Sequence, residues 1–281
     1  MRVLVTGARG LLGVAIVREF QSIADVSALD RRMLDVSDDN AVAASVAAAS
    51  PDVVVNCAAY NDVDGAEAAV QTALAVNAFG VLSLSRAARA VGATFVHYSS
   101  DFVFDGETDR PYTEEDSPNP RGAYAASKLL GDWFAIESPG AYVLRVESLF
   151  GDPGPNVARR GSLGTIVDRI KAGEEVPVFI DRTVSPSYTA DVAAATRALV
   201  QRRAAAGVYH CVNTGAAVWS EIASEAARLL GRPWVMKPLT LETANLVAPR
   251  PRYCALSNAK LAAAGVVMPH WKDALARFLA L

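Results

Sequence analysis

Apolar runs alternate with segments of helical periodicity through the first half of the chain. Short apolar runs bounded by turn residues predict buried strands, and apolar residues spaced three and four apart predict helices. Strands are expected at residues 2–6, 26–29, 52–56, 94–99 and 142–146. The intervening helices are expected at 11–21, 38–49, 65–90 and 120–136. This repeated alternation predicts a parallel sheet with helices on both faces.

The pattern becomes looser after residue 150. Residues 151–155 (GDPGP) predict a loop, and the stretch 233–253, which contains several prolines, is predicted to be irregular. Helices are expected at 163–172, 191–201, 220–230 and 272–279, with a short strand at 176–179. We therefore expect an α/β fold with a doubly wound parallel sheet in residues 1–151. A smaller C-terminal lobe follows in 152–281, from which some segments return to the sheet.

Composition narrows the class of protein. The 281 residues are 52% hydrophobic and 20% charged, and the formal net charge of −3 argues against a nucleic-acid partner. The alanine-rich stretches are too short to span a bilayer, and Arg2 leads directly into a predicted strand, so neither a membrane segment nor a signal peptide is expected. The three cysteines form no ligand pattern with the three histidines, which predicts reduced thiols, a cytoplasmic protein and no metal.

Three glycines, Gly7, Gly10 and Gly13, separate the first predicted strand from the first predicted helix. Glycine permits positive φ and close backbone approach, and the N-terminus of the following helix attracts a pyrophosphate. The spacing differs from Gly-x-Gly-x-x-Gly, and an ordinary tight turn is the alternative. The strand–turn–helix context nevertheless favours a Rossmann-like fold that binds a dinucleotide.

Charged residues near the second strand bear on the choice of that dinucleotide. Asp30 ends the strand, where a carboxylate can accept both ribose hydroxyls of NAD. Arg31 follows it and Arg9 lies in the glycine loop, where either guanidinium could pair with the 2′-phosphate of NADP or be solvated. The choice between NADH and NADPH therefore stays open.

Tyr124 and Lys128 stand four residues apart in a predicted helix and therefore share one face. An ammonium group stabilises a nearby phenolate, so Lys128 is expected to lower the pKa of Tyr124. Such a pair is common by chance and could be a solvated helix face. It gains meaning from the glycine-rich start of the chain and from Ser99 and Ser100, which end a strand upstream of it.

Several segments resemble, in their order and joint presence, the extended short-chain dehydrogenases/reductases and, within them, the dTDP-4-dehydrorhamnose reductases. These segments are PDVVVNCAAY (51–60), VDGAE (63–67), Asn77, SSDFVFDG (99–106), PYTEED (111–116), SPSYTAD (185–191) and RPR (250–252). The similarity covers nearly the whole chain. It implies reduction of a nucleotide-activated 4-keto-6-deoxy sugar by NAD(P)H.

The resemblance also implies roles for individual residues. Tyr124 would donate the proton to the forming alkoxide, Lys128 would hold the nicotinamide ribose, and Ser100 would hydrogen-bond the carbonyl oxygen. Ser99 is the rival for the serine role, but its side chain should point to the opposite side of the strand. Cofactor contacts are expected from Gly7, Arg9, Gly10, Leu11, Leu12, Gly13, Asp30, Arg31, Asp35, Cys57, Ala58, Ala59, Asn77, Tyr124 and Lys128.

The second lobe is expected to bind the nucleotide-sugar substrate. The sugar pocket is expected to contain Val103 and Phe104, and the pyrophosphate is expected to bind Arg250 or Arg252, with Arg159 and Arg160 as the next candidates. For each arginine a solvated surface charge is the alternative. The base of the nucleotide could stack on one of the tryptophans Trp219, Trp234 and Trp271, but packing in the core is the favoured interpretation for all three.

Departures from the family pattern limit the function. Related dehydratases have an Asp-Glu pair after the threonine that Ser100 replaces, whereas Phe102 follows Asp101 here, which argues against water elimination. Some members bind Mg²⁺ through acidic residues at a dimer contact, but no full set is matched, and a homodimer is left open. Two alternatives remain. One is a sugar-nucleotide epimerase, and the other is a non-catalytic regulatory subunit like that of methionine adenosyltransferase.

Overall fold

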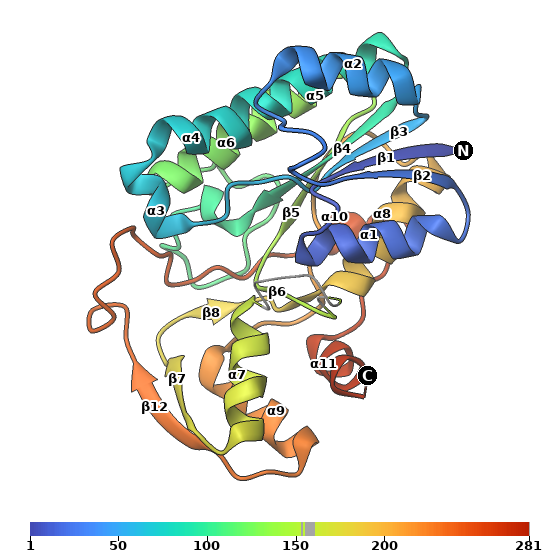
Figure 1. Cartoon of the computed structure of the whole chain (residues 1–281). Coiled ribbons are helices and arrows are strands. Elements are labelled where there is room, and N and C mark those ends of the chain that lie inside the picture. The colour runs from blue at the N-terminus through green and yellow to red at the C-terminus, as the bar shows by residue number, and fades with distance from the viewer. Residues whose placement is uncertain (153, 155–160, 281) are drawn as a thin grey trace.

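A six-stranded parallel sheet forms the centre of the molecule, as the sequence pattern predicts (Figure 1). The computed structural model describes residues 1–152, 154 and 161–280. In spatial order the strands are β10 (Gly207–His210), β5 (Tyr142–Val146), β4 (Thr94–Ser100), β3 (Val53–Asn56), β1 (Arg2–Thr6) and β2 (Asp25–Leu29). The order reverses between β1 and β3, and such sheets bind ligands at the carboxyl ends of the strands beside that point.

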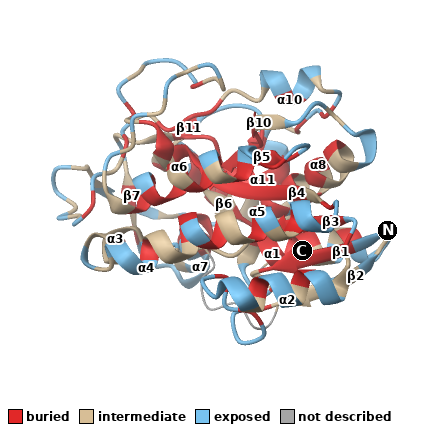
Figure 2. Cartoon of the chain, turned by 90° about the horizontal axis from the view of Figure 1, so that it is seen from above, coloured by how far each residue is buried: buried red, intermediate tan, exposed pale blue. Residues whose placement is uncertain are grey.

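Helices cover both faces of this sheet (Figure 1). One face carries α1 (Leu11–Gln21), α8 (Thr189–Arg202) and α10 (Ala259–Ala263), and the other carries α2 (Asp39–Ala49), α5 (Gly80–Ala90) and α6 (Ala123–Ile136). Val3 and Val5 of β1 pack in the core on the α1 side, whereas Leu4 packs on the α2 side. The central strands are therefore buried on both faces (Figure 2), which explains their continuous apolar runs.

The single helix predicted at 65–90 is wrong, because the segment is divided into four pieces. They are α3 (Val63–Ala68), α4 (Val70–Leu74), the π-helical turn η1 (Ala75–Phe79) and α5. Ala69 breaks the helix with φ −121° and ψ 44°. The π turn lies tightly against α6, since a Cβ at Gly131 would come within 2.2 Å of the Asn77 carbonyl oxygen. Packing against α6 thus accompanies a helical distortion that helical propensity alone does not reveal.

A second, smaller core lies below the carboxyl ends of the strands (Figure 1). It is built mainly from α7 (Gly161–Ala172), β7 (Glu175–Phe179), α9 (Trp219–Leu230) and α11 (Trp271–Leu279), and β12 (Val235–Leu239) lies at its edge beside β7. The stretch predicted to be irregular contains β12, which pairs in parallel with β7. This strand is largely exposed and contains Pro238, so it lacks the buried apolar pattern that identifies a strand from sequence.

Short elements join the two cores. β6 (Leu149–Phe150) pairs with β9 (Ser187–Tyr188), β8 (Thr183–Val184) pairs with β11 (Ala217–Val218), and the 3-10 turn η2 (Asp101–Val103) follows β4. The other predicted helices and strands are present, with ends shifted by a few residues. Within the described ranges, no helix combines the length and the apolar character needed to cross a membrane.

Candidate active site

The β1–α1 turn forms a tight glycine cradle at the carboxyl end of β1. Gly7 has φ +63°, and a Cβ there would lie 2.6 Å from backbone atoms of Cys57 and Ala58. A Cβ at Gly13 would lie 2.2 Å from the Gly7 carbonyl oxygen. Gly10 differs, because its Cβ would contact only the Gly7 oxygen, at 3.2 Å, and it stands as N-cap of α1. Gly7 and Gly13 therefore serve close packing, and Gly10 keeps the helix N-terminus open to an anion.

A cavity of about 230 Å³ lies beside this cradle and brings together most of the predicted cofactor residues. Its walls include Gly7, Arg9, Gly10, Asp30, Arg31, Asp35, Cys57, Ala58 and Ala59, together with Leu34, Val36, Tyr60, Asn61 and Val76. Three predicted contacts on α1 are not among the residues that line this cavity, namely Leu11, Gly13 and Leu12, which packs in the core. A glycine cradle at a helix N-terminus with a cavity beside it fits the shape of a dinucleotide.

Asn77, a predicted cofactor contact, is buried and makes three hydrogen bonds within the protein. Its side-chain oxygen accepts a hydrogen bond from the Tyr60 amide at 2.8 Å, and its nitrogen donates to the Tyr60 carbonyl at 3.0 Å. The same nitrogen donates to Ser127 Oγ at 3.0 Å. Asn77 thus fastens the loop after β3 to α6, the helix that carries Tyr124 and Lys128, and it positions the cavity wall.

Tyr124 and Lys128 lie side by side on α6 and are both buried. Lys128 Nζ donates a hydrogen bond to the Tyr98 carbonyl at 2.6 Å. Burial raises the pKa of Tyr124, and the negative charge of Asp101 adds to this, whereas a hydrogen bond with Ser100 acts in the opposite direction. The expectation that Lys128 lowers the pKa of Tyr124 is therefore wrong here, because desolvation of the phenolate dominates.

The same desolvation acts on the lysine. Burial lowers the pKa of Lys128 to about 8, although Asp132 and Cys57 favour its charged form. A tyrosine with a raised pKa keeps its proton at neutral pH and can donate it, which suits the acid that a ketone reduction requires.

The two serines at the end of β4 face different partners, as alternation along the strand predicts. Ser100 Oγ donates to Asp101 Oδ1 at 2.8 Å and accepts from the Phe102 amide at 3.2 Å, and Ser100 lies close enough to Tyr124 to act on the pKa of that phenol. Burial raises the pKa of Asp132 on α6, and the nearby Ser99 lowers it, although Ser99 Oγ has no hydrogen-bond partner within the described part of the chain. Ser100 is therefore the serine that lies beside Tyr124.

The residues after Ser100 do not lie where the sequence placed them. Val103 and Phe104 are only 0% and 1% exposed and pack in a small core cluster, so they do not form a wall of an open sugar pocket. Phe102, which precedes them, is partly exposed and meets the Tyr124 ring edge-on, with 5.5 Å between the ring centroids. The 3-10 turn reverses the alternation of an extended strand, which explains why the neighbouring aromatic residue faces the site.

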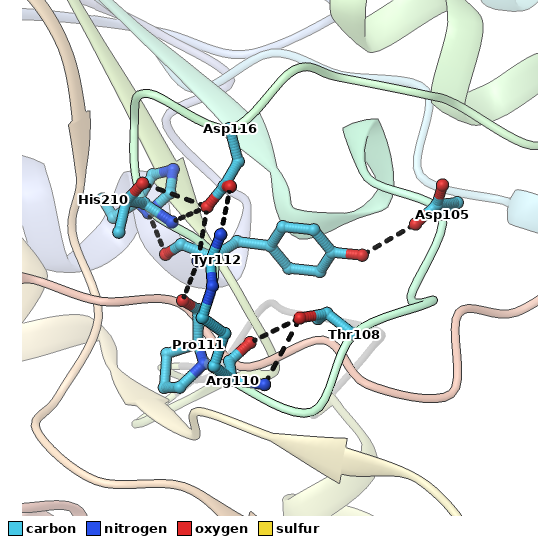
Figure 3. Close-up of polar contacts among 8 residues, drawn as sticks. Asp105, Thr108, Arg110, Pro111, Tyr112, Asp116 and His210 are labelled. Atoms are coloured by element: carbon cyan, nitrogen blue, oxygen red, sulfur yellow. Dashed lines mark hydrogen bonds and ion pairs between the residues drawn. The ribbon is translucent and has the colours of Figure 1, made fainter.

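The PYTEED segment holds the connection between β4 and α6 in place (Figure 3). The Tyr112 hydroxyl donates to Asp105 Oδ1 at 2.7 Å and accepts from the Gly106 amide at 2.9 Å. The ring of Tyr112 stacks on Phe104 at 4.2 Å, and the Tyr112 carbonyl lies 3.1 Å from His210 Nδ1. This motif therefore has a structural role, which is to fix the loop that leads from Ser100 to Tyr124.

The predicted phosphate-binding arginines differ in their surroundings. Arg250 Nη2 forms an ion pair with Asp64 Oδ2 at 2.8 Å, and its guanidinium lies 5.9 Å from the Phe102 ring. Arg252 is exposed. Arg159 and Arg160 lie outside the residues that the structure describes. Trp219 and Trp271 are buried in the second core and Trp234 packs against it, in agreement with the favoured reading of these residues.

Sequence reasoning missed Arg182, which enters a second cavity of about 260 Å³. The cavity walls also contain Arg169, Phe179 and Trp219, and the Arg182 guanidinium lies 5.8 Å from the Phe179 ring. Burial raises the pKa of Asp101, and the positive charge of Arg182 lowers it by a smaller amount. Because Arg182 acts on Asp101 in this way, the cavity that Arg182 enters lies close to the Ser100 end of β4. The signal available in the sequence was the position of Arg182 shortly after a predicted strand.

The doubly wound sheet, the glycine cradle and the grouping of Ser100, Tyr124 and Lys128 define an extended short-chain dehydrogenase/reductase. The likeness to a solved dTDP-4-dehydrorhamnose reductase structure supports the same assignment. More narrowly, the chain belongs to the family described as RmlD substrate binding domain, whose model matches residues 1–281.

Similar proteins agree with this assignment. A dTDP-4-dehydrorhamnose reductase from Streptomyces griseus is 38% identical over 98% of this chain and 91% of its own length. The crystal structure of a dTDP-4-dehydrorhamnose reductase from Clostridium acetobutylicum is 34% identical, covers 100% of this chain and 99% of its own, and has a TM-score of 0.93. The structure of the Bacillus anthracis reductase in complex with NADP is 32% identical, covers 99% and 98%, and also has a TM-score of 0.93. The family resemblance read from the sequence is confirmed.

Proposed function

We propose that this chain is an NAD(P)H-dependent reductase that converts the 4-keto group of a dTDP-linked 6-deoxy sugar to an alcohol. The observation that carries the proposal is the placement of Tyr124 beside Ser100 and Lys128 at the carboxyl end of the sheet, next to the glycine cradle. The names of the relatives, dTDP-4-dehydrorhamnose reductases, support this substrate class. An NADP complex in a relative supports the cofactor.

The arrangement supplies the groups that a ketone reduction needs. The bound reduced nicotinamide supplies the hydride. Tyr124 holds a proton at its hydroxyl oxygen because burial raises its pKa, and Ser100 offers a second hydroxyl to the ketone oxygen. Lys128 is held by the Tyr98 carbonyl and carries a positive charge below about pH 8. Negative charge that develops on the substrate oxygen therefore meets donors that are already in place.

The cavity around Arg182 is proposed to bind the nucleotide end of the substrate. Arg169 and Arg182 bring two positive charges to it, and Phe179 and Trp219 bring aromatic surface. A diphosphate and a base require these two kinds of contact. Arg252 is exposed and remains the proposed phosphate contact from the sequence-predicted set. Arg250 is a weaker candidate because Asp64 already pairs with it.

The test is oxidation of NADPH and NADH, followed by absorbance, with dTDP-4-keto-6-deoxy sugars as substrates. The wild-type chain should release one oxidised cofactor and one sugar alcohol per turnover. Tyr124→Phe should lower turnover by about 10²- to 10⁴-fold while cofactor affinity changes little. Interconversion of sugar epimers without net cofactor oxidation would indicate the epimerase. Absence of any turnover would favour the regulatory-subunit alternative, against which the intact site argues.

We also propose a cytoplasmic location and leave a homodimer as a hypothesis. The free cysteines Cys57, Cys211 and Cys254 support a reducing compartment. Cell fractionation tests the location, and analytical ultracentrifugation of the purified chain tests the oligomer. The absence of a required metal likewise stays a prediction, and reductase activity in the presence of a chelator tests it.

A further inference from the structure

A buried ion pair that the proposed reaction does not use lies behind Lys128. Arg145 on β5 donates a hydrogen bond to Asp132 on α6, with 3.1 Å between Arg145 Nε and Asp132 Oδ2. Only 1% of the Asp132 side chain and 6% of the Arg145 side chain is exposed. Burial of two charges has a large desolvation cost that their attraction only partly offsets, so stability alone is a weak reason for this pair.

Asp132 lies on the same face of α6 as Lys128. It stands four residues after the lysine, and both side chains are buried. Tyr124 stands on this face one turn before Lys128, as a neutral phenol, because burial raises its pKa. The second carboxyl oxygen of Asp132, Oδ1, is fully buried and has no hydrogen-bond partner among the described residues. Arg145 therefore occupies one oxygen of Asp132, and the other acts on its neighbours through its charge.

Lys128 has little other support for its charge. The ammonium is 3% exposed, and Nζ donates one hydrogen bond to the described residues, to the Tyr98 carbonyl at 2.6 Å, although an ammonium has three donors. Burial lowers the pKa of Lys128 to about 8. The charge of Asp132 gives the larger of two effects that oppose this, and Cys57 gives the other.

The other titratable groups around Lys128 are neutral at neutral pH. Burial raises the pKa of the Cys57 thiol, which follows β3. On β4, burial lowers the pKa of His97 well below its usual value and raises the pKa of Tyr98 well above its own. Among the described groups whose charge acts on Lys128, Asp132 is therefore the one that is negative at neutral pH.

Arg145 keeps Asp132 in place and ionised. Burial raises the pKa of Asp132, and Arg145 gives the largest effect in the opposite direction. The strand register places Arg145 opposite Ser99 of β4, and the Arg145 guanidinium lies 5.1 Å from the centre of the Phe104 ring. Charges of alternating sign thus run from Arg145 through Asp132 to Lys128 at the reacting end of the site.

We propose that Asp132 is a positioning residue that keeps the Lys128 ammonium charged beside Tyr124, with Arg145 holding Asp132 in place. The proposal rests on the proposed reductase function, in which the charge of Lys128 is needed at the reacting end. Asp132 touches neither substrate nor cofactor and acts only through Lys128. Without the Asp132 charge the ammonium is less favoured, so Lys128 should lose its proton at lower pH.

The first test needs neither substrate nor cofactor. The NMR shift of the Lys128 side chain, assigned with Lys128→Arg, reports the pH at which the ammonium loses its proton. This midpoint should lie near pH 8 in the wild-type chain. In Asp132→Asn, which keeps an oxygen for Arg145, it should lie about one pH unit or more lower. Asp132→Glu restores the charge and should raise the midpoint again. An unmoved midpoint in Asp132→Asn, or one equally low in Asp132→Glu, overturns the proposal.

Asp132→Asn leaves Arg145 without its anionic partner, and circular dichroism would show whether the variant folds. If it does not fold, Asp132→Asn combined with Arg145→Gln leaves no unpaired charge and should show the same lowered midpoint. The wild-type chain provides a check that needs no variant, because the carboxyl-carbon NMR shift of Asp132 should be that of an ionised group at neutral pH. A protonated Asp132 overturns the proposal.

The second test is the pH profile of NADPH oxidation with a dTDP-4-keto-6-deoxy sugar. In Asp132→Asn, the decline of kcat with rising pH should move to lower pH by the same amount as the NMR midpoint of Lys128. Well below that midpoint, turnover should stay close to that of the wild type, because Lys128 is charged in both. Turnover that is lower by the same factor at every pH, with the decline in its original place, would indicate a merely structural role and overturn the proposal.

Asp191→Asn is the matched control. Asp191 also pairs with an arginine, at 2.7 Å from Arg277, and its side chain is 10% exposed, but it does not act on Lys128. Loss of this pair should lower stability and leave the Lys128 midpoint alone, and a midpoint that moves as far as in Asp132→Asn overturns the proposal. If the wild-type chain oxidises no cofactor with any sugar nucleotide, the reductase proposal fails, and the NMR midpoints still decide whether Asp132 sustains the charge of Lys128.

Discussion

Arg9 and Asp30 form an ion pair in the wall of the cofactor cavity, with 2.9 Å between Arg9 Nε and Asp30 Oδ2. The other oxygen of Asp30 accepts hydrogen bonds from the amides of Arg32 and Met33, at 2.8 and 3.1 Å. The two side chains that argue for different cofactors are therefore bound to each other. Arg9 therefore weakens the preference of Asp30 for NADH, and Asp30 weakens the preference of Arg9 for NADPH.

Removal of Asp30 and removal of Arg9 should shift the cofactor preference in opposite directions. Asp30→Ala removes the charge that repels a 2′-phosphate and frees Arg9, so the kcat/KM ratio should move towards NADPH by about tenfold or more. Arg9→Ala should move the ratio towards NADH. Arg18→Ala, which breaks the exposed pair with Asp152, is the control and should leave the ratio alone. An unmoved ratio in both test variants would place the adenosine ribose elsewhere.

Two glycines of the cradle should respond differently to a side chain. Gly10 has φ −73°, which any residue adopts, so Gly10→Val should keep its circular dichroism and lose NAD(P)H binding measured by fluorescence. Gly7→Ala should instead destabilise the fold by more than about 1 kcal/mol, because its φ is positive and its Cβ would overlap the β3–α3 loop. Normal cofactor affinity in Gly10→Val would show that the pyrophosphate does not bind at this helix N-terminus.

Turnover should fall as pH rises through about 8. Burial lowers the pKa of Lys128 to about 8, so its ammonium is present below this pH and lost above it. The pKa of Tyr124 is raised, so the phenol keeps its proton across the same range and does not cause the decline. A pH profile of kcat tests this. In Lys128→Arg, the guanidinium stays charged, and any remaining activity should lack the decline. A wild-type profile that is flat or rises through this range would contradict the assignment.

Arg250 and Arg252 should have separable roles. Arg250→Ala breaks the bond to Asp64 and should lower the free energy of unfolding by about 1 kcal/mol, a reduced value because Asp64 is 39% exposed. Asp64→Asn should have a similar effect on stability. Arg252→Ala should raise the KM for the nucleotide sugar by about ten- to a hundredfold and leave the melting temperature unchanged. If Arg250→Ala raises this KM and Asp64→Asn does not, Arg250 is the phosphate contact.

The parallel sheet, the glycine loop and the helix that carries Tyr124 and Lys128 could all be predicted from the amino-acid sequence. Strands buried on both faces are continuous apolar runs, and a helix places residues four apart on one face, so both features can be recognised locally. The turn residues Gly7 and Gly13 are equally local, because the first strand and the first helix adjoin them. The family resemblance depended on such segments and their order.

The pairing of the polar groups and the burial of individual side chains could not be predicted in this way, because they depend on how distant segments pack together. Arg250 and Asp64 are 186 residues apart, and Glu147 approaches Asp101 only because β5 lies beside β4. The burial of Phe104, the break at Ala69 and the raised pKa of Tyr124 likewise depend on what packs against them. Solvent exclusion and charge pairing arise between segments distant in sequence, and for that reason local patterns could place these residues but could not assign their partners or their protonation.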